Sequence, residues 1–143
     1  MRVEQLVKAP REQVFQTFTD YEAWPQFSDL CTRVTVTERA GNTVHLDMEI
    51  KVMGRIAKRK EKHVLTAPEQ VLVEGETVGS TNTSVWKFDP VPEGTLVKGR
   101  LEFQSKGLYK LMGPFTNRLQ QTSFDEWLRA FAKYVEAKSP SIS

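Results

Sequence analysis

The chain has 143 residues, 39% of them apolar and 27% charged, which fits one globular domain with a single core. Its formal net charge of +2 is too small to indicate nucleic-acid binding, and its single cysteine, Cys31, excludes an internal disulfide and favours a reducing, cytoplasmic location. The first residues are charged and contain no long apolar run, which argues against a signal peptide or a transmembrane segment.

The N-terminal residues predict a strand followed by two short helices. The strand covers residues 3–8 and ends before Pro10, which presets the backbone for the first turn of a helix over 11–19. A second short helix is expected over 21–27, with Asp20 as its N-cap.

Strand-forming segments separated by turn-forming residues occupy the middle of the chain. The predicted strands are 32–39, 43–52, 56–66, 70–78, 83–89 and 95–103. Short strands with short turns between them, such as those expected at 79–81 and 90–94, favour an antiparallel meander. The strand over 43–52 alternates between apolar and polar residues, which is typical of a sheet with one buried face.

The segment over 107–138 predicts a long helix that needs a sheet to bury its apolar residues. Gly113 and Pro114 interrupt it, so we expect a kink, or a short helix followed by a long one. In the long helix, the side expected to face the core carries Phe124, Trp127, Phe131, Tyr134 and Val135. Gln120 and Ser123 continue that line, where they either line a ligand cavity or lie at its wet rim.

An earlier group of apolar residues falls on a different side of that helix: Leu108, Met112, Phe115 and Leu119. We expect this group to form a partly exposed patch that marks either a ligand gate or a partner surface, including that of a weak homodimer. Residues 139–143 are expected to be a disordered tail outside a single domain over 1–138.

The run from Lys58 to His63 is the most unusual polar stretch. In a strand its three lysines share one face, which we expect to face water, and Arg59, Glu61 and His63 share the other. Buried charges need partners, so Arg59 and Glu61 are expected to pair, and Glu61 and His63 are candidates for an acid/base pair. The alternative is a sheet edge that is wet on both faces, with the lysines preventing edge pairing.

Motifs for cofactors, metals and nucleophilic catalysis are missing from the sequence. His45, His63 and Cys31 lack the spacing of metal ligands, no glycine-rich loop fits a phosphate, and no serine lies in a nucleophile-elbow pattern. We therefore expect neither a metal nor a cofactor.

The opening VKAPREQVFQTFTDYEAWPQF, the segment WKFDPVPEGTLVKGRLEF and the closing amphipathic helix resemble the START-like SRPBCC superfamily. The stretch DYEAWPQFSDLCTRV resembles its polyketide cyclase/dehydrase branch, which includes coenzyme-Q-binding and ribosome-association toxin types. The resemblance implies an α+β helix-grip fold, in which a seven-stranded antiparallel sheet wraps around a long C-terminal helix and two short helices follow strand 1. It also implies an internal cavity for lipids, polyketides, quinones or hormones.

The expected cavity lies between the inward face of the sheet and the terminal helix. Strand parity and the helical pattern predict these ligand-binding residues: Met48, Ile50, Arg59, Glu61, His63, Trp86, Phe88, Val97, Leu101, Phe115, Gln120, Ser123 and Trp127.

Three functions are open at this point. The first is binding or transport of a hydrophobic small molecule, such as a lipid, a quinone or a polyketide-like compound. The second is a polyketide cyclase or dehydratase that uses acid/base assistance from Arg59, Glu61 or His63. The third is a regulator that binds ribosomes or proteins through its surface lysines. No catalytic constellation in the sequence decides whether a reaction takes place.

Overall fold

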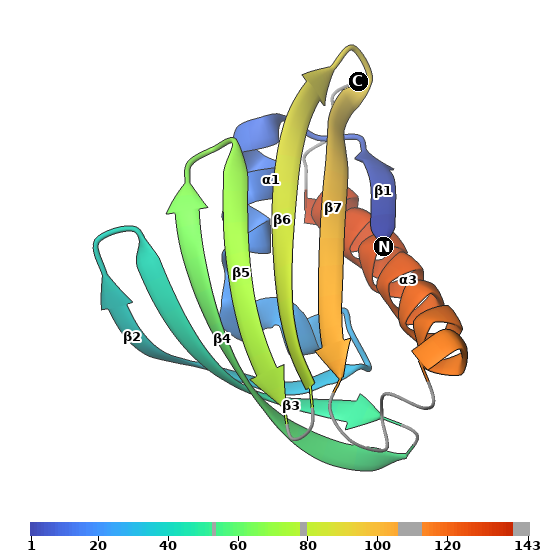
Figure 1. Cartoon of the computed structure of the whole chain (residues 1–143). Coiled ribbons are helices and arrows are strands. Elements are labelled where there is room, and N and C mark those ends of the chain that lie inside the picture. The colour runs from blue at the N-terminus through green and yellow to red at the C-terminus, as the bar shows by residue number, and fades with distance from the viewer. Residues whose placement is uncertain (53, 78–79, 106–112, 139–143) are drawn as a thin grey trace.

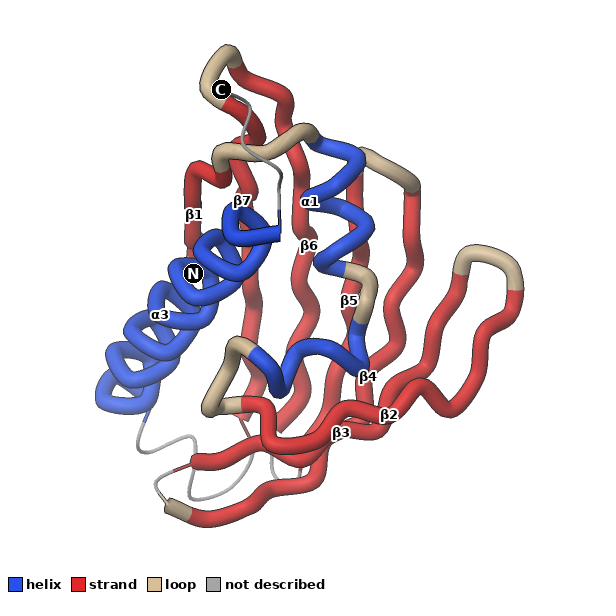
Figure 2. Tube along the Cα trace, turned by 180° about the vertical axis from the view of Figure 1, so that it is seen from behind, coloured by secondary structure: helices blue, strands red, loops and turns tan. Residues whose placement is uncertain are grey.

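One strongly bent antiparallel sheet carries all the helical segments on the same face, as Figures 1 and 2 show from opposite sides. The computed structural model describes residues 1–52, 54–77, 80–105 and 113–138, and it describes their side chains except at 52, 105 and 113–119. The elements in chain order are β1 (Arg2–Val7), α1 (Arg11–Phe18), the 3-10 helix η1 (Tyr21–Gln26), β2 (Cys31–Ala40), β3 (Thr43–Val52), β4 (Arg55–Thr66), β5 (Gln70–Thr77), β6 (Ser80–Val91), β7 (Gly94–Ser105) and α3 (Gly113–Lys138).

The strand order confirms the expected meander and adds the position of the first strand. The seven described strands are arranged β1-β7-β6-β5-β4-β3-β2, and every neighbouring pair is antiparallel. Because β1 pairs with β7 and β2 lies at the opposite edge, α1 and η1 cross the concave side of the whole sheet (Figure 2). This seven-stranded sheet with its C-terminal helix is the α+β helix-grip fold that the resemblance implied.

Two predicted turns are shorter in the structure than in the sequence analysis. Ser80 and Thr81 belong to β6, where Ser80 pairs with Thr77, and β6 continues through Pro90 to Val91. The neighbouring strands extend far enough to pair with these residues, and the ladder hydrogen bonds outweigh their local preference for a turn. Pro90 lies near the end of its strand, where a missing N–H group is tolerated.

The core lies between the concave face of the sheet and the helical segments. The alternation predicted for β3 is confirmed, because Val44, Leu46 and Met48 are buried. The other large contributors are Val7, Phe15, Phe18, Tyr21, Trp24, Val71, Trp86, Phe88, Val97, Leu101, Leu128 and Phe131.

Helix α3 begins at Gly113 with Pro114 in its first turn, where the missing N–H group of proline costs no helical hydrogen bond. Its later apolar group faces the core as predicted, since Trp127, Phe131 and Val135 are buried. No described helix combines the length and the apolar character that a membrane crossing requires. The predicted patch of Leu108, Met112, Phe115 and Leu119 and the predicted tail lie outside the residues and side chains described, so both stay predictions.

Candidate ligand-binding site

Aromatic rings from the sheet and the helical segments meet around Trp127 of α3. Its ring centroid lies 5.0 Å from that of Trp24 in η1 and 5.5 Å from that of Phe131, on which it stacks. Phe18 of α1, Trp86 of β6 and Phe27 also belong to the group, at 5.8, 6.3 and 5.5 Å. Rings in such arrangements attract each other beyond their buried area, and apolar aromatic walls suit a flat hydrophobic ligand.

The indole of Trp86 packs directly on the backbone of β7, because the residue beneath it is a glycine. A Cβ atom added at Gly99 would lie 2.6 Å from Cζ3 of Trp86, so only a residue without a side chain lets the ring lie this close to the β7 backbone. The indole Nε1 donates a hydrogen bond of 3.1 Å to Oγ of Ser84, which satisfies the buried N–H group.

Beside the aromatic cluster, β4 contributes three polar side chains to the inward face. Arg59, Glu61 and His63 stand opposite Met48, Leu46 and Val44 of β3, on the buried face, as strand parity predicted. Only 12% of the Arg59 side chain and 11% of the Glu61 side chain are exposed, and His63 is 1% exposed. The three lysines of the run are exposed, and β4 lies inside the sheet, which excludes the alternative of a wet edge.

The three inward side chains form one hydrogen-bonded chain that continues to β6. Arg59 Nε donates to Oε2 of Glu61 at 2.6 Å, and Nε2 of His63 lies 2.7 Å from Oε1 of the same carboxylate. Arg59 Nη2 also donates to Oδ1 of Asn82. Gly75 of β5 pairs with both Glu61 and Asn82 and leaves the path open, since a Cβ atom there would lie 2.6 Å from Asn82 Oδ1 and overlap the guanidinium.

Glu61 is the ionised centre of this network. Burial raises its pKa, but the hydrogen bond from His63 and the charge and hydrogen bond of Arg59 outweigh burial and lower the pKa from 4.5 to about 2. A carboxylate only accepts hydrogen bonds, so Nε2 of His63 carries the hydrogen between them. Glu61 therefore orients His63 and does not serve as a proton donor near neutral pH.

Tyr21 of η1 lies against His63 on the other side of its ring. The two ring centroids are 4.7 Å apart in an edge-to-face arrangement, and Tyr21 is 1% exposed. Burial, and then the charge of Glu61, raise the pKa of the Tyr21 hydroxyl, so it stays protonated. Among the described residues, neither Tyr21 Oη nor His63 Nδ1 has a hydrogen-bond partner.

Most of the predicted ligand-binding residues share this inward side. Those that are buried or nearly so are Met48, Arg59, Glu61, His63, Trp86, Phe88, Val97, Leu101 and Trp127, whereas Ile50, Gln120 and Ser123 are half-buried. Phe88 packs on Phe15 and Phe18 of α1 at 5.4 and 5.2 Å, away from the polar network. Phe115 lies outside the described side chains. A ligand-binding role for these residues stays a prediction.

Sequence reasoning missed the second half of the polar network. Tyr21 carries no signal beyond a place in a short helix, and Gly75 is an isolated glycine in a predicted strand. Asn82 and Ser84 lie at every second position of β6 with Trp86, and all three are buried, so period-two parity was the available signal.

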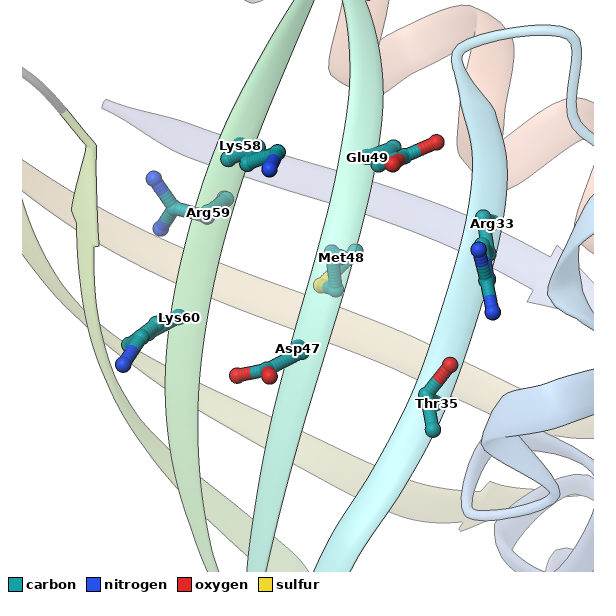
Figure 3. A pocket seen from close by; sticks show the side chains of 8 residues that line it. All are labelled: Arg33, Thr35, Asp47, Met48, Glu49, Lys58, Arg59 and Lys60. Atoms are coloured by element: carbon teal, nitrogen blue, oxygen red, sulfur yellow. The ribbon is translucent and has the colours of Figure 1, made fainter.

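Two pockets that described residues line lie elsewhere. One, of about 300 Å³, is lined by residues of β2, β3 and β4: Arg33, Thr35, Asp47, Met48, Glu49, Lys58, Arg59 and Lys60 (Figure 3). Another, of about 290 Å³, is lined by Arg11, Thr66, Glu69, Gln70, Lys87, Phe88 and Asp89. Neither is the apolar cavity expected under α3, which stays a prediction. In the described part of the chain, no three His, Cys, Asp or Glu side chains converge as a metal ion requires.

Comparison with known proteins places this fold and this sequence in one family. Residues 7–132 match the family described as polyketide cyclase / dehydrase and lipid transport, which is most of the chain. No curated protein matches the sequence.

Similar solved structures cover nearly the whole chain. TTHA0849 from Thermus thermophilus has 21% identity and a TM-score of 0.89, over 98% of this chain and 99% of that one. A START superfamily protein from Mycobacterium smegmatis has 19% identity and a TM-score of 0.82, over 96% and 95%. The Zhui aromatase/cyclase from a Streptomyces species has 11% identity and a TM-score of 0.83, over 99% and 96%. At these identities the likeness shows the fold alone, and it is the matched sequence that decides membership. The chain belongs to the polyketide cyclase/dehydrase and lipid transport family.

Proposed function

We propose that this protein binds a hydrophobic, ring-containing small molecule between the inward face of the sheet and α3. The observation that carries the proposal is the polar network of Arg59, Glu61 and His63, buried beside a cluster of aromatic rings. A buried ion pair contributes little to stability compared with apolar residues of the same volume, so its presence in the core favours a role in recognition. Aromatic walls with a few placed polar groups are the usual composition of a small-molecule site.

Native mass spectrometry of the purified protein tests the proposal by detecting a co-purified lipid or quinone. Titration with the methyl ether of β-naphthol, a flat apolar compound, tests it directly, because the buried tryptophans report binding through their emission. We expect Glu61→Gln to change the dissociation constant several-fold and Lys60→Ala, on the exposed face of the same strand, to leave it unchanged. If the purified protein retains no ligand and titration gives no saturable change in emission, the proposal is excluded.

A cyclase or dehydratase is the second candidate, and the geometry of His63 favours it. Glu61 holds Nε2 of this imidazole, which leaves Nδ1 able to accept a proton from a bound compound. Such a base should speed hydrogen–deuterium exchange at the acidic carbon of β-tetralone, a flat bicyclic ketone. Proton NMR measures the rate of this exchange. Exchange that is no faster with the wild-type protein than with His63→Gln would argue against catalysis and leave binding in place.

The regulator alternative has no comparable observation in its favour. Lys60 stands between Asp47 and Glu76 in neighbouring strands, and Lys58 stands opposite Glu49. Acidic side chains therefore balance the lysines along the outer face, and a balanced surface does not attract the phosphates of ribosomal RNA.

A further inference from the structure

Two fully buried side chains beside the aromatic cluster each keep one polar atom without a partner. Tyr21 and His63 are both 1% exposed, and neither Tyr21 Oη nor His63 Nδ1 has a hydrogen-bond partner in the part of the chain that the structure describes. Buried polar atoms in native proteins are nearly always paired, because leaving one unpaired costs more than its hydrogen bond gains. Because the centroids of the two rings are only 4.7 Å apart, a single small group that contacts both atoms is the simplest partner for them.

The chemistry of the two atoms limits what that partner is. Glu61 takes the hydrogen on Nε2 of His63, so in the neutral form of the imidazole Nδ1 offers a lone pair and needs a donor. The Tyr21 hydroxyl offers a hydrogen and needs an acceptor. A hydroxyl group meets both needs, since it donates through its hydrogen and accepts through its oxygen. A ketone or ether oxygen satisfies Tyr21 only.

The neighbouring side chains show what carries this hydroxyl. Trp24 lies 5.3 Å from Tyr21 and 6.2 Å from His63 between ring centroids, and it also contacts Trp127 of α3. The polar pair therefore borders the aromatic cluster and is separated from the outer face of the sheet. A compound that reaches both atoms also contacts aromatic rings.

We infer that Tyr21 and His63 form a hydroxyl-binding subsite, and that the ligand of this protein is a hydroxylated ring compound such as a phenol. This inference rests on the proposed function and narrows its ligand class. Arg59 and Glu61 act on the ligand through His63, as positioning residues that fix the orientation of its ring. Simple fatty acyl chains, which have no hydroxyl on a ring, are excluded as the preferred ligands.

The affinity test compares β-naphthol with its methyl ether at about pH 8, where β-naphthol keeps its proton. The two probes share their rings and differ in the hydroxyl hydrogen. We expect the wild-type protein to prefer the naphthol about tenfold, because only its hydroxyl can donate to Nδ1 of His63, and we expect Tyr21→Phe to weaken the binding of both probes several-fold. Tyr134→Phe is the matched control, because its hydroxyl lies on α3 and bonds to Gln26 outside the subsite.

Nitrogen NMR tests the same subsite without a substitution. The chain has two histidines, so labelling histidine with ¹⁵N gives two sets of signals, and His45 on the outward face of β3 is an internal reference. We expect β-naphthol to shift the Nδ1 signal of His63. The methyl ether should not shift this signal comparably, and neither probe should shift the signals of His45.

The outcomes separate the two proposals. Equal affinity for both probes, binding of the probes that Tyr21→Phe leaves unchanged, or naphthol binding without a shift at His63 overturns the subsite and leaves the proposed function intact. Failure of both probes to bind overturns the proposed function and the subsite with it.

Discussion

Glu61 stays ionised in a place where burial alone would neutralise it. Each of its carboxylate oxygens has one close cationic or hydrogen-donating partner, Arg59 on one side and His63 on the other. These contacts lower its pKa to about 2 against the opposing effect of burial. The folded protein therefore holds Glu61 deprotonated at pH values where the unfolded chain already binds a proton.

This difference predicts a loss of stability in acid. Because the folded-state pKa lies below the ordinary value of 4.5, the contribution of Glu61 is complete above about pH 4.5 and is lost as the pH falls towards 2. The shift corresponds to a free energy of unfolding on the order of 3 kcal/mol. We expect Glu61→Gln to lower stability near neutral pH and to flatten its pH dependence between these values, as measured by urea unfolding.

Glu74→Gln is the control for this experiment, because Glu74 is exposed on the outward face of the neighbouring strand β5. It should keep the acid dependence of the wild-type protein. If the free energy of unfolding depends on pH in the same way for the wild type and for Glu61→Gln, another group causes the loss of stability in acid.

The thiol of Cys31 is buried. Burial raises the pKa of its thiol to about 11, although hydrogen bonds from Ser28 and Trp127 oppose the shift. Only the thiolate reacts with alkylating reagents, so we expect iodoacetamide to label the folded protein at about pH 8 more than a hundredfold more slowly than the urea-unfolded chain. Rapid labelling under native conditions, followed by mass spectrometry, would show that the start of β2 opens locally.

At the scale of elements, two glycines let large side chains cross neighbouring strands. Gly75 leaves room for the Arg59 guanidinium over β5, and Gly99 leaves room for the Trp86 ring over β7. Both strands would otherwise carry a side chain into the core at these positions. The site therefore depends on Gly75 and Gly99, whose lack of a side chain makes room for the larger side chains beside them.

Gly99→Ala is expected to destabilise the fold by about 1–3 kcal/mol, because its Cβ atom would lie 2.6 Å from the Trp86 ring. Trp86→Phe removes the indole atoms that the new Cβ atom would overlap. The loss of stability in the double variant should therefore be smaller than the sum of the losses in the two single variants. Denaturant unfolding of the four proteins measures the coupling. Additive losses would mean that the backbone of β7 and not the ring limits the packing.

The same elements show what a sequence predicts well. The inward position of Arg59, Glu61 and His63 followed from the period of a single strand, because successive side chains alternate faces whatever the neighbours are. The hydrogen bond from Arg59 to Asn82 depends on the register of three strands and on the absence of a side chain at Gly75. The sequence pattern of one strand contains no information about this register. Tyr21 reaches His63 only because η1 crosses the sheet, which is tertiary information.

At the scale of the whole molecule, α3 is bound to the sheet edge and to η1 as well as to the core. Glu136 accepts a hydrogen bond of 2.8 Å from the backbone N–H of Lys8, and the Gln121 side chain donates to the carbonyl of Arg2 at the other end of β1. Tyr134 donates to Gln26 of η1. With the aromatic cluster, these contacts connect the last helix to the first strand and to the helical segments that follow it.

A single core of this kind predicts one cooperative unfolding transition. All three tryptophans of the chain, Trp24, Trp86 and Trp127, lie in the aromatic cluster, so their emission reports the contact of η1, β6 and α3. Far-UV circular dichroism reports the whole sheet and the helices. Since the cluster cannot lose α3 without exposing the rings of the other elements, we expect the two signals to share one midpoint in guanidinium chloride. Tryptophan emission that changes at lower denaturant would instead show that α3 leaves the sheet first, and the helix would then be a separate unit of stability.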